Sequence, residues 1–228
     1  MTNQEFSNEF DILYNNISSN QAPGLTEYEK SVFLTNAQDN LVLELLTGKN
    51  MSGESFEKTE ELREYLTNII ATQTTENPQL STSEGLTDNT YIIECPENLW
   101  MIVFESVKFN SSSMGCTPSS LIEVVPVTHD EFARINRNPF RKSNKNRVLR
   151  LNATGKLELI SDYPIASYTM RYITHLDPII LTDLGGGLSI KNIDSETECK
   201  LNPALHEAIL GRAVQLAKTS MGLLGPGN

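Results

Sequence analysis

The stretch IASYTMRYIT, residues 165–174, alternates along ten residues and decides how the second half of the chain is interpreted. A two-residue period predicts a strand with one buried face. Similar stretches precede it, and residues 152–155 have the composition of a hairpin turn. We therefore expect a mainly antiparallel sheet with strands at residues 91–95, 99–109, 121–127, 147–151, 156–160 and 165–174.

The first seventy residues follow a helical period instead. Thr2 with Glu5, and Thr26 with Glu29, have the spacing of capping boxes, and Gly48 is placed to end the second helix. Short links between the predicted helices are typical of an antiparallel bundle. The apolar stripes are Phe6, Phe10, Leu13 and Ile17 in the first helix and Val32, Phe33, Ala37, Leu41 and Leu45 in the second, with a third helix at residues 55–70.

The sequence predicts an α+β protein in four parts. Residues 72–90 are polar and without period, which indicates a linker, and Asn202 with Pro203 starts a last helix. The three glycines at 185–187 indicate a flexible turn. The parts are an acidic helical bundle (1–72), a linker (73–90), a β-rich domain (91–201) and a C-terminal helix with its tail (202–228).

The formal net charge of -11 is concentrated at the N-terminal end. Residues 1–90 have 15 acidic and 4 basic side chains, whereas residues 91–228 have 14 of each. The charge therefore changes where the hydrophobic period changes, which indicates a domain boundary.

The one concentrated basic region is RINRNPFRKSNKNRVLR, residues 134–150, called the basic segment below. It has seven cations and no acid, and such cations repel one another unless an anion meets them. Thr128 with Glu131 predicts a short helix over 129–137, so that the rest of the basic segment is largely a loop. The candidate contact residues are Arg134, Arg137, Phe140, Arg141, Lys142, Lys145, Arg147 and Arg150.

Three interpretations of the basic segment stay open. It could contact a nucleic-acid backbone, although the isoelectric point of about 4.8 and the single aromatic residue Phe140 disfavour DNA binding. It could pack on the acidic N-terminal segment of a second copy, a heterologous contact that can close into a ring. It could also be a solvated loop.

No motif in the sequence indicates an enzyme. His129, His175 and His206 each lie close to a carboxylate in the sequence, but no nucleophile motif, HExxH, P-loop or Rossmann motif accompanies them. We therefore expect ordinary surface or capping histidines, with no catalytic, cofactor-binding or metal-binding residue.

The cysteines and the hydropathy predict a reducing compartment and no membrane contact. Cys95, Cys116 and Cys199 are odd in number and without CxxC spacing, which favours free thiols over disulfides or zinc. The longest apolar run, residues 99–104, is far too short to cross a bilayer, and the N-terminus has no secretory pattern.

Four stretches of the sequence carry a resemblance to a known family. They are EFDILYNNISSNQAPGLTEYEKSVFLTNAQDNLV (9–42), EVVPVTHDEFARINRNPFRKSNKNRVLRL (123–151), YITHLDPIIL (172–181) and CKLNPALHEAILGRAVQLA (199–217). NPFR (138–141) and NQAPG (20–24) are their most distinctive parts. Together they resemble structural proteins of crAss-like bacteriophages, of the kind that forms a head-to-tail ring. The architecture alone also resembles the tail adaptors of short-tailed phages.

The resemblance implies a non-enzymatic virion protein without cofactors, assembled in the cytoplasm of the host bacterium. Its copies would form a ring, with the twelve-fold symmetry of the portal, at the head-tail interface. The ring would dock under the portal protein, contact neighbouring tail rings and surround the channel through which genomic DNA leaves, without sequence-specific binding. A DNA-contacting structural protein that uses the basic segment remains the alternative.

Overall fold

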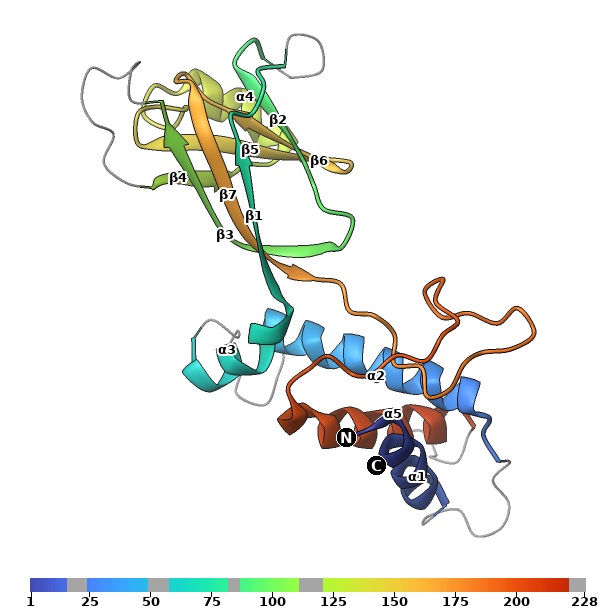
Figure 1. Cartoon of the computed structure of the whole chain (residues 1–228). Coiled ribbons are helices and arrows are strands. Elements are labelled where there is room, and N and C mark those ends of the chain that lie inside the picture. The colour runs from blue at the N-terminus through green and yellow to red at the C-terminus, as the bar shows by residue number, and fades with distance from the viewer. Residues whose placement is uncertain (16–23, 49–57, 82–86, 111–120, 222–228) are drawn as a thin grey trace. The chain divides into compact units, whose positions relative to one another are not determined.

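A computed structural model describes residues 1–15, 24–48, 58–81, 87–110 and 121–221, which form two compact units (Figure 1). The helical unit comprises Met1–Ile69 and Leu176–Asn228, and the β-unit comprises Ile70–His175. The two ends of the chain therefore share one unit, whereas the pattern along the sequence had separated the N-terminal bundle from residues 202–228. The fold is mixed α+β, as expected.

The helical unit is built around its last helix. The ring of His206, at the start of α5, lies 5.3 Å from the ring of Phe6 in α1. Near the end of α5, Lys218 donates a 2.7 Å hydrogen bond to the backbone oxygen of Leu13, so α1 and α5 run in the same direction. The helices are α1 Asn3–Asn15, α2 Glu27–Thr47, α3 Glu60–Leu66, η1 Thr67–Ile69, η3 Pro203–Leu205 and α5 His206–Ser220.

The predicted start and stop signals of the first two helices are confirmed. Backbone and side chain of Thr2 and Glu5 bond reciprocally, at 2.8 and 3.3 Å, and Thr26 with Glu29 forms the second capping box. Gly48 ends α2 with a φ of 71°, a conformation that glycine adopts without strain. These local contacts are formed by residues three apart, which is why the sequence alone could predict them.

The predicted third helix is shorter than expected. Its described part begins after the cap Thr59, and α3 with η1 ends at Ile69. The start predicted at residues 55–57 lies outside the described residues. From Ile70 the chain is extended as strand β1, which the polar composition of residues 72–76 had concealed.

The buried faces of α1 and α2 differ from the predicted stripes. In α1 Tyr14 is buried and Leu13 is exposed, although Leu13 was expected in the stripe. In α2 the three polar side chains Ser31, Thr35 and Gln38 are almost completely buried. A stripe argument assumes that only apolar side chains face the interior, and α2 buries a polar row as well.

This polar row holds the chain that returns from the β-unit. The Ser31 hydroxyl accepts a 3.0 Å hydrogen bond from the backbone N–H of Leu181, and the Thr35 hydroxyl accepts one of 3.1 Å from Ile179. The Gln38 amide donates to the backbone oxygen of Asp177 at 3.0 Å. Residues 177–181 have no regular secondary structure, so these side chains replace the partners that a strand or helix would supply.

The β-unit is one seven-stranded curled sheet of order β1-β7-β3-β4-β5-β6-β2. The chain passes through a helix between β4 and β5, and these two strands pair in parallel, while the other neighbours are antiparallel. Between β1 and β2, Leu80 forms an isolated antiparallel bridge with Tyr91 of β2. The strands are β1 Ile70–Glu76, β2 Thr90–Glu94, β3 Leu99–Phe109, β4 Ile122–Pro126, β5 Arg147–Ala153, β6 Lys156–Ile160 and β7 Ile165–Thr174.

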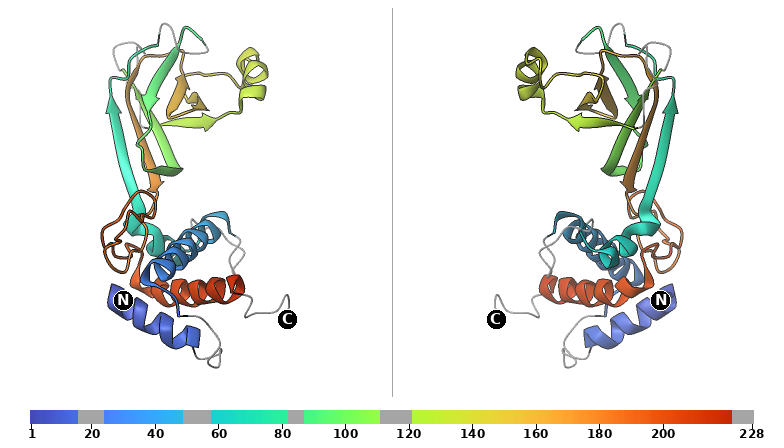
Figure 2. Two further views of the ribbon diagram at one scale, coloured as in Figure 1. Left: turned by 90° about the vertical axis from the view of Figure 1, so that its right-hand side faces the viewer. Right: turned by 90° about the vertical axis from the view of Figure 1, so that its left-hand side faces the viewer.

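Both faces of the sheet are covered where β5 and β6 run. One face lines the main core, to which Val148 and Tyr168 belong. Helix α4, His129–Arg137, lies outside the curled sheet (Figure 2). Its Phe132 side chain packs with Leu149 and Leu151. The helix was predicted within these bounds, but the Thr128 side chain makes no capping hydrogen bond, so the predicted capping box is absent.

Replacing Thr35 with valine tests the polar row of α2. Thr35→Val keeps the side-chain shape but leaves the buried N–H of Ile179 without its acceptor, and we expect a loss of about 1–3 kcal/mol in the free energy of unfolding. Urea denaturation followed by far-ultraviolet circular dichroism measures this loss. The control is Thr47→Val, whose exposed hydroxyl donates only to its own helix, and equal losses in both variants would contradict the role of the row.

Candidate functional site

Six of the eight candidate contact residues are exposed on the β-unit. They lie in α4 and in a turn region over 138–146, and the two other candidates lie in β5. Arg147 is half-buried and Arg150 is buried. The exposed residues are Arg134, Arg137, Phe140, Arg141, Lys142 and Lys145.

The turn region has a defined conformation set by two asparagines. The Asn138 side chain accepts a 2.9 Å hydrogen bond from the N–H of Phe140, and its backbone oxygen accepts one of 3.0 Å from Arg141. Asn144 accepts from Asn146 in the same way, at 2.9 Å. Such side-chain bonds two residues ahead mimic a backbone turn, so the segment needs no partner to adopt this shape.

A buried serine ties the turn region to the sheet. The Ser143 hydroxyl accepts a 3.0 Å hydrogen bond from the backbone of Asp162, and Lys142 forms an ion pair with the carboxylate of Asp162 at 3.3 Å. Phe140, at the tip of the first turn, is 88% exposed. The ring of Phe140 is therefore exposed to solvent on an ordered turn.

Part of the positive charge of the basic segment is paired with carboxylates in the structure. Arg134 pairs with Glu131 one turn earlier in α4, and Lys142 pairs with Asp162. Arg150 pairs with Glu105 of β3. Three of the seven cations are thus paired, Arg134 with a residue of its own helix and two others with carboxylates that the fold brings close, so repulsion within the segment is weaker than expected.

Arg150 belongs to the interior of the sheet. Its Nε lies 3.0 Å from the Glu105 carboxylate, which also accepts a 2.6 Å hydrogen bond from the Tyr168 hydroxyl. Burial raises the pKa of Glu105, although the hydrogen bond from Tyr168 and the charge of Arg150 act to lower it. Burial also raises the pKa of Tyr168. The strand period explains this position, because Arg150 follows Val148 on the core-facing side of β5.

The helical unit carries most of the acidity. It has 18 acidic and 8 basic side chains, a net charge of -10, and the β-unit has 11 and 10. The acidic character predicted for the N-terminal segment therefore extends to residues 176–228, which share its unit. The net charge of the helical unit, -10, is close to the -11 of residues 1–90, so the charge contrast with the basic segment remains.

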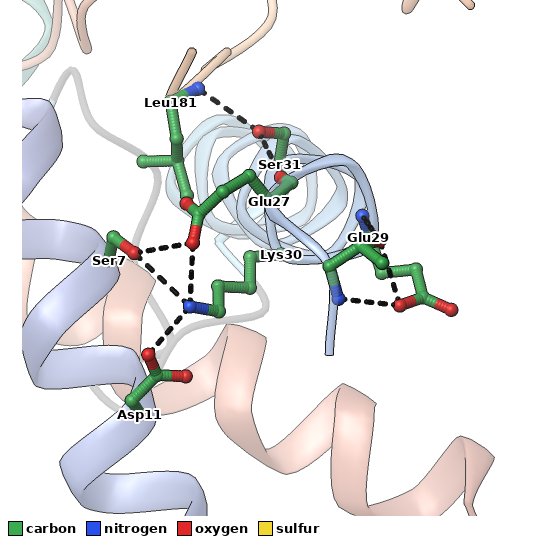
Figure 3. Close-up of polar contacts among 8 residues, drawn as sticks. Ser7, Asp11, Glu27, Glu29, Lys30, Ser31 and Leu181 are labelled. Carbon is green, nitrogen blue, oxygen red and sulfur yellow. Dashed lines mark hydrogen bonds and ion pairs between the residues drawn. The ribbon is translucent and has the colours of Figure 1, made fainter. Parts of the chain in front are cut away.

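One buried lysine links α1 to α2 within this acidic unit (Figure 3). The Lys30 ammonium lies 2.7 Å from Asp11 and 2.9 Å from Glu27, and it donates to the Ser7 hydroxyl at 3.1 Å. Burial alone would lower the pKa of Lys30, but the bonds to Asp11 and Glu27 outweigh it and the pKa is raised. The lysine thus remains charged and neutralises part of the acidity at this helix contact.

A second ion pair joins α2 to α5. The Arg212 guanidinium binds the Glu44 carboxylate with two bonds, of 2.5 and 2.6 Å. The hydrogen bond from Arg212 lowers the pKa of Glu44, whose carboxylate therefore stays ionised to lower pH. Two-bond pairing of this kind fixes direction as well as distance.

The histidines and cysteines do not gather into a reactive site. His129 bonds the backbone oxygen of Asn152 at 2.8 Å, and His175 stacks on Trp100 with ring centroids 5.0 Å apart. His206 is buried, which corrects the expectation of a surface or capping residue. Among the described residues no group of three His, Cys, Asp or Glu could hold a metal ion.

The described cysteines are free thiols. Burial raises the pKa of both Cys95 and Cys199, which keeps them protonated. Cys116 lies outside the described residues. In the part of the chain that the structure describes, no helix is long and apolar enough to cross a membrane.

The candidate sites are therefore charged surfaces suited to binding other macromolecules. Comparison with known proteins gives the family: residues 1–226 match the model described as phage tail ring protein 3/4. Ring protein 3 of Bacteroides phage crAss001 is 45% identical over 219 residues, covering 95% of each chain. Ring protein 4/5 of the same phage is 33% identical over 234 residues, covering 96% of this chain and 93% of that protein.

The chain belongs to the phage tail ring protein 3/4 family. This confirms the resemblance to crAss-like phage ring proteins that the four quoted stretches indicated. The match extends over both structural units, since it includes the helical ends of the chain and the sheet between them.

Replacing Arg150 distinguishes its interior role from a surface role. Arg150→Met leaves the Glu105 carboxylate buried without its cation, and we expect a loss of roughly 3–5 kcal/mol in the stability of the β-unit. Urea denaturation followed by fluorescence of Trp100, the single tryptophan, reports this unit. Lys142→Met, which breaks an exposed ion pair, is the control and should cost at most about 1 kcal/mol.

The buried His206 predicts loss of stability in acid. Burial lowers its pKa, so below about pH 6.5 the unfolded chain binds a proton that the folded chain does not, and the free energy of unfolding falls as the pH falls. Thermal unfolding at about pH 8 and about pH 5 measures the loss. It should shrink in His206→Gln and stay unchanged in His129→Gln; an unchanged loss in both variants would refute this assignment.

Proposed function

We propose that this chain is a non-enzymatic structural protein of the virion whose copies form an oligomeric ring in the head-to-tail connector. The observation that carries the proposal is the 45% identity to Ring protein 3 over 95% of both chains. Identity at this level over the full match supports a shared architecture and a shared assembly. The exposed, ordered basic segment is a surface suited to such assembly.

The ring joins the portal to the tail and surrounds the channel through which DNA leaves the head. It has twelve copies, following the portal, and it contacts the portal protein and neighbouring tail rings. Two relatives named for different rings of one phage support stacking of related rings. If the helical unit lines the channel, its net charge of -10 keeps the passing DNA from adhering.

The basic segment of one copy packs on the helical unit of the next copy. A patch of cations on one unit and a charge of -10 on the other favour this heterologous contact, and repeating it around an axis closes a ring. The exposed residues Arg137, Phe140 and Arg141 take part directly. Arg150 acts only by holding β5 in the sheet.

The purified chain should form closed rings, either alone or on its portal protein. Negative-stain microscopy and light scattering after size-exclusion chromatography give the copy number. Assembly takes place in the cytoplasm of the host, so no oxidising conditions are needed. A chain that stays monomeric in both preparations would contradict the proposal.

A charge-reversed variant tests the contact surface. Replacing Arg137, Arg141 and Arg147 with glutamate should abolish rings, because like charges then face each other, and circular dichroism should show a folded chain. The control reverses the three cations Arg63, Lys108 and Arg171, which are exposed outside the basic segment and give the same charge change.

The same pair of variants separates protein contact from DNA contact. If the basic segment contacts DNA instead, the first variant still forms rings, and only its retardation of duplex DNA at low salt is lost. Intact rings from the first variant would therefore exclude the basic segment from the interface between copies.

A further inference from the structure

Phe140 has the properties of an anchor residue. It is 88% exposed, yet its backbone is held by the side chain of Asn138 at 2.9 Å. Because the turn is already ordered, burying this ring in a partner costs little backbone entropy. Aromatic residues presented in this way dominate the binding energy of many interfaces.

Cations lie on both sides of Phe140 in the sequence. Arg141 follows it directly, and Arg137 and Lys145 lie exposed on the same turn region or at the end of α4. Arg134 and Lys142 form ion pairs, whereas among the described residues these three cations form none. A partner for Phe140 should therefore offer an apolar hollow with negative charge around it.

The helical unit has such a hollow between α2 and α5. It is a groove of about 580 Å³. Its apolar side chains are Phe33 and Leu216, both half-buried. A groove of this volume lies within the size range of sites that bind a side chain or a small ligand.

The rim of this groove is polar. Asp39, whose carboxylate forms an ion pair with Lys191 at 2.7 Å, lines it from α2, and Thr219 and Ser220, the last residues of α5, line it from the other side. The C-terminal end of α5 is the negative end of its helix dipole. This end of the groove therefore favours guanidinium and ammonium groups around an apolar centre.

We propose that Phe140 of one copy inserts into the α2–α5 groove of the next copy in the ring, with Arg137 and Arg141 at its rim. This inference rests on the proposed ring function and identifies the two faces that meet. The occupant is a second copy of this chain, because the charge of the helical unit and the cations around Phe140 are complementary. The contact is heterologous, so each copy supplies one anchor and one groove.

Two variants each remove one side of the contact. Phe140→Ala removes the anchor and should weaken the contact roughly 30-fold, the effect of losing a hot-spot residue. Asn36→Arg combined with Thr219→Arg changes two exposed rim residues and should repel the basic segment. At concentrations where the unaltered chain forms rings, each variant alone should be monomeric and folded.

Mixing the two variants is the decisive experiment. The groove-altered chain still has Phe140 and the anchor-altered chain still has its groove, so one contact can form and the next cannot. Light scattering should show a dimer of about 51 kDa, twice the mass of the 25.4 kDa chain, and no ring. A mixture that stays monomeric, or a single variant that still forms rings, would overturn the pairing.

Matched controls carry the same changes elsewhere. Phe104→Ala removes another exposed aromatic side chain of the β-unit, and Thr47→Arg with Ala208→Arg adds two charges to exposed positions of α2 and α5 outside the groove. Both control chains should form rings. If the unaltered chain forms no rings, both the proposed ring function and the pairing of Phe140 with the groove are wrong. If it forms rings but the two variants form them as well, only the pairing of Phe140 with the groove is wrong.

Discussion

The structure depends on a row of polar side chains in the core of the helical unit. Residues 177–181 enter that core outside any regular strand or helix, with a single bridge from Ile180 to Thr197, and buried backbone groups must be bonded. Ser31, Thr35 and Gln38 of α2 supply those bonds. Because the returning chain is held there, α5 can pack on α1 and α2, and the two ends of the sequence form one unit.

Charge is used in two ways in this molecule. Inside each unit, single cations are held by carboxylates, as Lys30 is by Asp11 and Arg150 is by Glu105, and such pairs specify one arrangement of the elements around them. On the surface, the basic segment and the acidic helical unit leave an excess of opposite signs on different units of the chain. Repeated contact between identical copies can use that separation.

Local patterns predicted most of the regular elements. The six strands from β2 to β7 lie within a residue or two of their expected bounds, because alternation and turn residues act over short distances. The capping boxes and Gly48 mark helix ends for the same reason. Strand β1 was missed because its side chains are mostly polar, and its pairing with β7 depends on residues about a hundred positions away.

In the candidate site, too, some features follow from local sequence and others from distant residues. The basic segment and its exposed Phe140 could be found in the sequence, because composition and the Asn138 turn signal are local properties. The sequence could not show that Arg150 faces the core, that Leu13 is exposed or that Ser31 is buried. Each of these depends on which distant element covers that face. Residue order along the chain was enough to locate the charge and most of the helices and strands. Long-range packing decided which side chains point inward, because burial is a property of neighbours in space.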